Sequence, residues 1–176
     1  MRVAAAVAAC CATLVAAGCG TRAVDGQADP VGVAAGEPTF SPCDDIPDEA
    51  LRQIGVDPTT ESRDILGVEQ PGWKICGWSG DRYSVSVLAA PHTLDDVRSS
   101  NENTDFTAVE IDGRSGVRYR KVADNEGKRC DLAIPSGSGV VLLFVRFRTL
   151  VGPLDLLEPC EIATQAVRDL SSVIPQ

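Results

Sequence analysis

Cysteine is the residue type in this chain whose number and spacing point most directly to chemistry. The 176-residue sequence contains seven cysteines, and Cys10 and Cys11 lie in an apolar N-terminal segment that we expect to be removed on export. The rest of the chain carries Cys19 and then Cys43, Cys76, Cys130 and Cys160. Four cysteines in an exported domain predict two disulfides. Zinc is disfavoured, because no pair has the close Cys-x2-Cys spacing of a zinc site.

Cys19 has the sequence context of a lipidated cysteine. Arg2 precedes an apolar stretch, residues 3–17, that is too short to span a bilayer and indicates a signal peptide. The stretch leads into Ala16-Ala17-Gly18-Cys19, which resembles a bacterial lipobox. In such a motif the cysteine thiol receives a diacylglycerol and the cysteine becomes the mature N-terminus. The alternative is an ordinary secretory signal followed by an incidental cysteine.

A run of basic residues stands out in an otherwise acidic protein. The formal charge is −9, yet the sixteen positions from Arg114 to Arg129 hold six of the 16 basic residues. These are Arg114, Arg118, Arg120, Lys121, Lys128 and Arg129. Such a patch could meet an anionic partner, namely lipid headgroups, a phosphorylated wall polymer or an acidic protein surface. The alternative is a solvated sheet face whose charge is balanced by Asp124, Glu126 and Asp131.

Other catalytic and metal-binding patterns are weak or absent from the sequence. The single histidine, His92, follows Pro91 in a predicted turn and suits a surface role better than general base catalysis. The chain contains no Gly-x-Ser-x-Gly elbow and no P-loop. An acidic cluster could recruit calcium but lacks the alternating spacing of a calcium loop: Asp44, Asp45, Asp48 and Glu49. We therefore expect no cofactor and no bound metal, and the net negative charge disfavours nucleic-acid binding.

The residue pattern predicts one α+β domain. We assign residues 1–18 to the signal peptide, 19–42 to a Gly-, Ala- and Pro-rich tether, and 43–176 to the folded part. We expect one helix from about residue 44 to 54, a polar loop over 59–70, and a C-terminal helix from about 159 to 173. Strands are expected over 73–79, 83–89, 107–111, 116–122, 129–134 and 140–149, with a short helix over 94–100.

The expected architecture is an antiparallel sheet of about five to six strands covered by the N-terminal and C-terminal helices. The strand over 140–149 is apolar on both faces, which places it at the centre of the sheet. Three disulfide connectivities are possible. We favour Cys43–Cys76 with Cys130–Cys160, because this pairing ties each long helix to its nearest strand. Each bridge would then contribute roughly 3 kcal/mol in the chain-entropy model.

The stretch Trp73–Trp78 holds both tryptophans. In a strand, Trp78 shares a face with Cys76, so these two side chains are expected to pack together under the first helix. Trp73 belongs to the opposite face. It is either a second core residue or an exposed aromatic that could touch a ligand.

Several of these features together resemble a known family. They are Cys43-Asp44 before a short helix that ends at Gly55, Cys76-Gly77-Trp78, the strand-turn Val109-Glu110-Ile111-Asp112-Gly113-Arg114, Cys130, and Cys160 opening a helix that ends at Ile174-Pro175. With the lipobox and tether, the pattern resembles actinobacterial lipoproteins grouped as domain of unknown function three-five-five-eight. The resemblance implies a location on the outer face of the cytoplasmic membrane or in the cell wall, and it brings no catalytic residues. The element order is also similar to PsbP-like α/β/α sandwiches, which implies nothing about function.

Three functions remain open from the sequence. The favoured one is a non-catalytic binding or accessory module of the cell envelope, exported and held to the membrane through a lipid on Cys19. The second is a structural or assembly lipoprotein that contacts another envelope protein through a sheet edge or a helix face. The third is a hydrolase that uses carboxylates such as Asp95 and Asp96.

Overall fold

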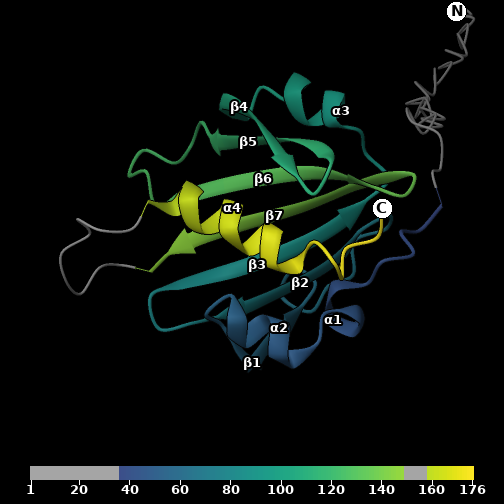
Figure 1. Cartoon of the computed structure of the whole chain (residues 1–176), viewed down its shortest axis with the longest axis vertical. Coiled ribbons are helices and arrows are strands. Elements are labelled where there is room, and N and C mark those ends of the chain that lie inside the picture. The colour runs from purple at the N-terminus through teal and green to yellow at the C-terminus, as the bar shows by residue number, and fades with distance from the viewer. Residues whose placement is uncertain (1–35, 149–157) are drawn as a thin grey trace, which may run out of the picture. The chain divides into compact units, whose positions relative to one another are not determined.

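A seven-stranded antiparallel sheet forms the centre of the protein (Figure 1). The computed structural model describes residues 36–148 and 158–176. The strand order is β1-β2-β3-β7-β6-β5-β4. The strands are β1 Asp57–Arg63, β2 Lys74–Ser79, β3 Tyr83–Ala90, β4 Asn103–Ile111, β5 Arg114–Lys121, β6 Arg129–Ser136 and β7 Gly139–Phe147. The helices are α1 Pro42–Asp45, α2 Asp48–Gln53, α3 Leu94–Ser99 and α4 Pro159–Leu170.

The main core lies on one face of the sheet, beneath α1, α2 and α4. Alternate residues of the central strands point to this face, including Val87 of β3, Leu143 of β7 and Leu132 of β6, and each of them is fully buried. Helix α4 lies across β6 and β7 (Figure 1) and buries an apolar stripe that includes Ala163 and Leu170. We call this side the helix-covered face.

The opposite side is only partly covered, and we call it the open face. Helix α3 contributes Val97 to a small apolar cluster with Val117, Tyr119 and Ala133. Towards β2 and β3 the open face becomes polar, because Ser84 and Ser86 alternate with the buried valines of β3. The amphipathic pattern of β3 therefore decides which side of the sheet is packed and which remains open to solvent.

Both disulfides have the sequential pairing favoured from the sequence. Cys43 of α1 is bonded to Cys76 of β2, and Cys130 of β6 is bonded to Cys160 of α4. Cys76 and Trp78 are both buried on the helix-covered face, as their spacing predicted. The prediction that residues 140–149 form the central strand is also confirmed for its described residues, since β7 is the fourth of seven strands.

The predicted strand number was too low. Most of β1 lies in the segment 59–70 that we expected to be a polar loop, and the strand pairs with β2 through Ser62↔Gly77 and Arg63↔Cys76. All but one of its residues are exposed. An edge strand with one partner and no buried face carries no hydrophobic alternation, so the sequence pattern that identifies buried strands was missing.

The predicted helix arrangement was wrong as well. The single N-terminal helix is two short helices, because Ile46 is extended and Pro47 lacks the N–H needed to continue α1. The N-terminal and C-terminal helices share one face, and the short α3 lies on the other. The reason is the sheet register, which directs Cys76 and Cys130 to the same face, so both disulfides fasten their helices there.

The predicted signal peptide, the predicted lipid attachment at Cys19 and most of the predicted tether lie outside the described residues. The last residues assigned to the tether are described, and Phe40 among them is buried in the core. Within residues 36–148 and 158–176, no helix is both long and apolar enough to cross a membrane.

Candidate anion-binding cleft

Three basic side chains from neighbouring strands meet on the open face. Arg129 of β6 is the direct cross-strand partner of Arg146 of β7. Lys121 of β5 follows Tyr119 by two residues and so projects to the same face, since Tyr119 is paired with Asp131 of β6. Like charges placed directly opposite each other destabilise a sheet. The fold nevertheless holds these three cations in one row.

The row lines an open cleft of about 940 Å³. Its walls come from the turn after α3, the end of β5, the loop that joins β5 to β6, the start of β6 and the end of β7. They are formed by Asn101, Glu102, Lys121, Val122, Ala123, Asp124, Asn125, Glu126, Arg129 and Arg146. A hollow of this volume is large enough for a small organic ligand.

Arg129 lines the cleft and is held in place by two contacts. Its Nε and Nη2 donate to the two carboxylate oxygens of Asp131 at 2.5 and 2.7 Å. Its guanidinium also lies 3.8 Å from the ring centroid of Phe144, a cation–π contact. Two of the five N–H donors of the guanidinium are thus used by Asp131, and three remain for a ligand.

Asp131 is the one buried charged residue among the described part of the chain, with 2% of its surface exposed. A buried carboxylate is tolerated only when it is paired, and Arg129 supplies that pairing. Tyr119 lies beside it, and burial, reinforced by the negative charge of Asp131, raises the pKa of the Tyr119 hydroxyl. The phenol therefore stays neutral at physiological pH.

Of the other basic residues at the cleft, two form ion pairs with glutamates and one forms none within the described part of the chain. Lys121 Nζ lies 3.6 Å from Glu102, and Lys128 Nζ lies 2.5 Å from Glu126. Asp124 accepts the backbone N–H groups of Lys128 and Arg129, which fixes the loop that forms one wall. Arg146 is exposed and has no ion pair with any residue in the described ranges. It is therefore the cation most available to an anionic ligand.

The structure divides the basic run predicted from the sequence between the two faces. Lys121 and Arg129 reach the cleft, with Lys128 in the adjoining loop. Arg118 and Arg120 share a side of β5, as expected, but that side is the helix-covered face, because Arg118 is the partner of Leu132. Arg120 donates to the Glu158 carboxylate, and Arg114 donates to the carbonyls of Ser171, Ile174 and Pro175.

Arg146 was missed as a member of the patch. It lies 17 residues beyond Arg129 in the sequence, outside the run of basic residues that are close together along the chain. A signal was present, since Arg146 is a charged residue within the otherwise apolar β7. Combined with the hairpin register of β6 and β7, that signal could have placed it opposite Arg129.

The other candidate residues serve local structure. His92 packs against Trp73 with 5.0 Å between ring centroids, and both side chains are half-buried. Asp96 completes a capping box with Thr93 at the start of α3, and Asp95 pairs with Arg98. Neither aspartate lines the cleft, so the two carboxylates proposed for hydrolysis do not converge on it.

The acidic cluster proposed for calcium is spread over the first two helices. Asp44 accepts hydrogen bonds from Arg63 and Ser41, which hold the pKa of the Asp44 carboxyl down to about 2. Asp45 caps the backbone N–H of Ser41, and Asp48 pairs with Arg52. These carboxylates are thus engaged with protein donors within α1, α2 and their neighbours.

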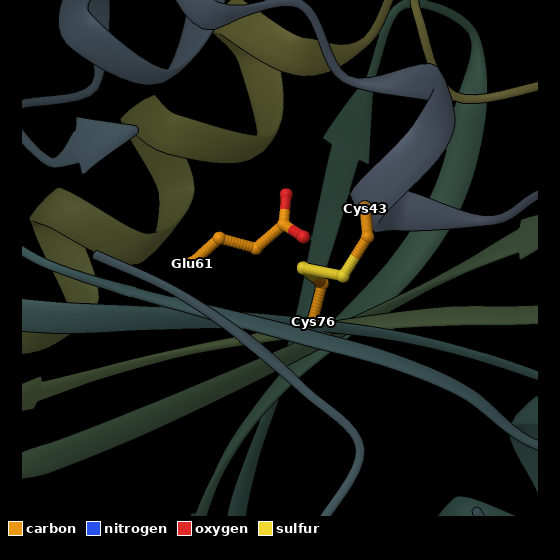
Figure 2. A group of neighbouring side chains, drawn as sticks. All are labelled: Cys43, Glu61 and Cys76. Atoms are coloured by element: carbon orange, nitrogen blue, oxygen red, sulfur yellow. A yellow bond between two sulfur atoms is a disulfide. The ribbon is translucent and has the colours of Figure 1, made fainter. Parts of the chain in front are cut away.

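One group of metal-ligand type lies close together, at the first disulfide. Glu61 points towards the sulfurs of Cys43 and Cys76 (Figure 2), and one ligand atom from each residue lies within 4.8 Å of the others. The two sulfurs are bonded to each other. A disulfide has no thiolate to offer a metal, so this group has a structural role.

Comparison with known families gives one result. Residues 5–172 match the family model described as protein of unknown function (DUF3558). The chain belongs to the DUF3558 family. No curated protein and no solved structure gave a significant match. The DUF3558 match confirms the family expected from the cysteines, the Cys-Gly-Trp strand and the Asp-Gly turn, whereas the actinobacterial source and the likeness to PsbP-like sandwiches stay predictions.

Proposed function

We propose that the protein is a non-catalytic binding module of the cell envelope that receives an anionic ligand in the cleft beside β5, β6 and β7. The observation that carries the proposal is the cross-strand pair Arg129↔Arg146. Stability accounts for Arg129, the partner of Asp131, but not for Arg146, which places a like charge directly opposite Arg129. A ligand that accepts hydrogen bonds from both guanidinium groups turns this repulsion into a binding site.

The cleft also suggests what kind of ligand fits. Arg146 and the free N–H groups of Arg129 form the basic end, while Glu102, Asp124 and Glu126 line the other walls. The ligand should therefore carry a compact anionic group, such as a phosphate or carboxylate, attached to a polar or cationic portion. An extended polyanion would reach past the basic end and meet the carboxylates of the rim, whereas a compact anion such as pyrophosphate or citrate can occupy the basic end alone.

The proposed location of the module rests on its sequence. The apolar leader and the lipobox at Cys19 support export and attachment to the outer face of the cytoplasmic membrane. Two disulfides are consistent with an oxidising compartment. In this proposal the lipid holds the domain at the membrane, and the cleft supplies the binding activity.

Calorimetric titration of the purified, lipidated full chain with inorganic pyrophosphate tests the binding site. Arg146→Gln is expected to weaken binding about tenfold, because it removes charge-assisted hydrogen bonds. Since Arg146 is exposed and faces a like charge, this variant should fold with undiminished stability. Raising the salt concentration should weaken pyrophosphate binding to the native chain.

Arg118→Gln is the matched control. It removes the same charge from the same sheet, but on the helix-covered face, so pyrophosphate affinity should stay unchanged. An equal loss of affinity in Arg118→Gln and Arg146→Gln would show a diffuse electrostatic effect. Absence of pyrophosphate binding to the native chain, together with absence of binding to citrate as a carboxylate probe, would contradict the cleft as an anion site.

A second function is supported by the edge strand β4. None of the described strands pairs with its outer edge, and Phe106 of β4 is 40% exposed. An exposed edge of this kind suits addition of a strand from another envelope protein, the assembly role left open by the sequence. Phe106→Glu should then abolish a crosslink between β4 and its partner in intact cells, whereas Arg146→Gln should leave that crosslink in place.

A further inference from the structure

The hairpin between β1 and β2 ends in an exposed apolar tip that the proposed function does not use. Ile65 and Val68 form an isolated bridge around Leu66-Gly67, with Val68 N–H donating to the Ile65 carbonyl at 3.0 Å. Leu66 is 96% exposed, and Ile65 and Val68 are 55% and 61% exposed. Three neighbouring aliphatic side chains thus project from the domain into solvent.

The backbone of this tip is unfavourable for leucine. Leu66 and Gly67 have φ values of 55° and 76°, the left-handed pair that defines a type I′ turn. A bulky residue rarely adopts positive φ, because its Cβ crowds the backbone. Leucine is therefore unfavourable at this position on two counts, its exposure to solvent and its positive φ, if the turn serves only to join two strands.

A second turn in the same molecule shows the ordinary solution. Asp112-Gly113 joins β4 to β5 with φ values of 48° and 78°, between the paired residues Ile111 and Arg114. The two turns have the same geometry and the same second residue. Aspartate tolerates the left-handed conformation at the first position, and it is a standard residue there. Leucine at the corresponding position of the first turn is therefore not explained by folding.

The tip lies near the place where the chain enters the domain. Glu37 accepts a hydrogen bond from the backbone N–H of Gly72 at 3.1 Å and lies 3.3 Å from Lys74 Nζ, so it is fixed to the returning arm of this hairpin. Cys19 precedes Glu37 by 18 residues (37 − 19). Eighteen residues can span at most about 65 Å, so a lipid on Cys19 would keep the hairpin within that distance of the membrane.

We propose that Ile65, Leu66 and Val68 insert into the interface of that membrane and fix the orientation of the domain. The tip would lie at the boundary between lipid headgroups and acyl chains, where its aliphatic side chains are stabilised by burial. The inference rests on the lipid anchor of the proposed function. Asp64 and Glu69 flank the tip, so the contact is apolar and should favour zwitterionic over anionic lipid.

This insertion would turn the cleft away from the membrane. Along β2 the tip adjoins the end at Lys74, which pairs with Ala89 of β3. Arg146 lies at the opposite end of the strands, because it pairs with Ser84, which in turn pairs with Ser79. A tip buried in lipid at one end of the sheet therefore presents the anion-binding residues to the outside of the membrane at the other.

Hydrogen exchange of the full chain tests the proposal. The lipidated protein is reconstituted in phosphatidylcholine vesicles, and its exchange is compared with that of the unlipidated Cys19→Ser chain in buffer. Amides of residues 65–68 should exchange at least about tenfold more slowly on vesicles, the factor that burial of one leucine supplies. Vesicles of phosphatidylglycerol should give weaker protection.

The turn at Asp112-Gly113 is the internal control. It lies at the same end of the sheet on the opposite edge, so crowding by the vesicle surface alone would slow both turns equally, and that result would contradict insertion. Leu66→Asn keeps the turn geometry and should return the exchange of residues 65–68 to its rate in buffer. Its stability should not fall, since asparagine suits positive φ better than leucine does.

Failure of the lipid anchor and failure of the inserted tip can be distinguished by experiment. The mass of the intact protein reports the lipid on Cys19, and vesicle flotation reports attachment to the bilayer. A lipidated chain that floats with the vesicles while residues 65–68 stay unprotected overturns the inserted tip and leaves the anchor intact. A chain from the native host that carries no lipid overturns the anchor, and the inference falls with it.

Discussion

Strand β5 carries basic side chains to both faces of the sheet, and the two faces use them differently. On the helix-covered face, Arg114 and Arg120 bond to the two ends of α4 and its C-terminal extension. On the open face, Lys121 joins Arg129 and Arg146 along the cleft. The same residue type fastens a helix on one side and lines a hollow on the other. The difference arises from the surroundings of each side chain. On the helix-covered face it meets the end of a helix, and on the open face it meets solvent.

The largest loss of stability is expected from substitution of Arg129. This residue shows that the open face also contributes to stability. It lies in the cleft, yet it is the partner of the buried Asp131. Arg129→Gln should lower the free energy of unfolding by about 3–5 kcal/mol, because it leaves a buried carboxylate without its cation. Chemical denaturation of the purified chain measures this loss.

A second variant separates the lost pair from the lost packing over Phe144. Arg129→Gln combined with Asp131→Asn removes both charges and should recover most of the stability, since neutral amides can bond to each other. If the double variant is as unstable as Arg129→Gln alone, the cation–π contact or the packing of the arginine stem is the important term. The cleft would then depend on Phe144 more than on Asp131.

The disulfides are expected to have the next largest effect, and both belong to the helix-covered face. Cys130 and Cys160 are 30 residues apart, and Cys43 and Cys76 are 33 residues apart. Replacing either pair by alanine should lower the free energy of unfolding by about 3 kcal/mol in the chain-entropy model. Thermal unfolding of the two double variants measures it.

Because the two loops are nearly equal in length, the two variants form a matched pair. A markedly larger loss for Cys130→Ala with Cys160→Ala would mean that α4 depends on its bridge for packing. That result would also mean that the Arg120–Glu158 contact cannot hold the same end of the helix without the bridge. Equal losses would support the entropic account.

Arg114 offers a smaller test of the helix-covered face. Its side chain is half-buried and donates to three carbonyls after α4, two of them, from Ser171 and Ile174, in part-buried bonds. Arg114→Gln should lower stability by about 1–3 kcal/mol, because carbonyls at a helix end lose their donor. Arg118→Gln on the same strand is the control and should change stability by less than about 0.5 kcal/mol. Urea denaturation of both variants decides whether basic residues on this face act through α4.

The sequence predicted best those strands whose side chains are buried. The apolar residues on both faces of β7 correctly predicted its central place, and the spacing of Cys76 and Trp78 correctly predicted a shared buried face. β1 was missed because an exposed edge strand has the composition of a loop. The pattern of apolar residues in a strand reflects which side chains are buried, and β1 has no buried side chain.

The candidate site could be predicted only in part for a related reason. Closeness in sequence grouped Arg118, Arg120 and Lys121, but successive strand residues point to opposite faces. The cleft instead joins residues that share a face on different strands, such as Arg129 and Arg146. Their neighbourhood depends on the register between β6 and β7, which is set by the turn between Ser136 and Gly139 and by the packing of the whole sheet.

The smallest predicted effect concerns an exposed ion pair, the counterpart of the buried pair in the cleft. Arg63 Nη2 lies 2.7 Å from Asp44, and this hydrogen bond, with one from Ser41, lowers the pKa of the Asp44 carboxyl from 3.8 to about 2. A pKa that is lower in the folded state stabilises the protein above the unfolded value. That contribution is present above pH 3.8 and is lost as the pH falls through about 2.

Carboxyl carbon NMR titration of Asp44 should therefore give a midpoint near 2 in the native chain and a midpoint closer to 3.8 in Arg63→Gln. The accompanying loss of stability should be small and should shrink with added salt, because both partners are exposed to solvent. An unchanged midpoint in Arg63→Gln would assign the shift to Ser41 and the start of α1. In that case the exposed arginine contributes nothing measurable, and only burial, as at Asp131, makes an arginine–carboxylate pair important for this fold.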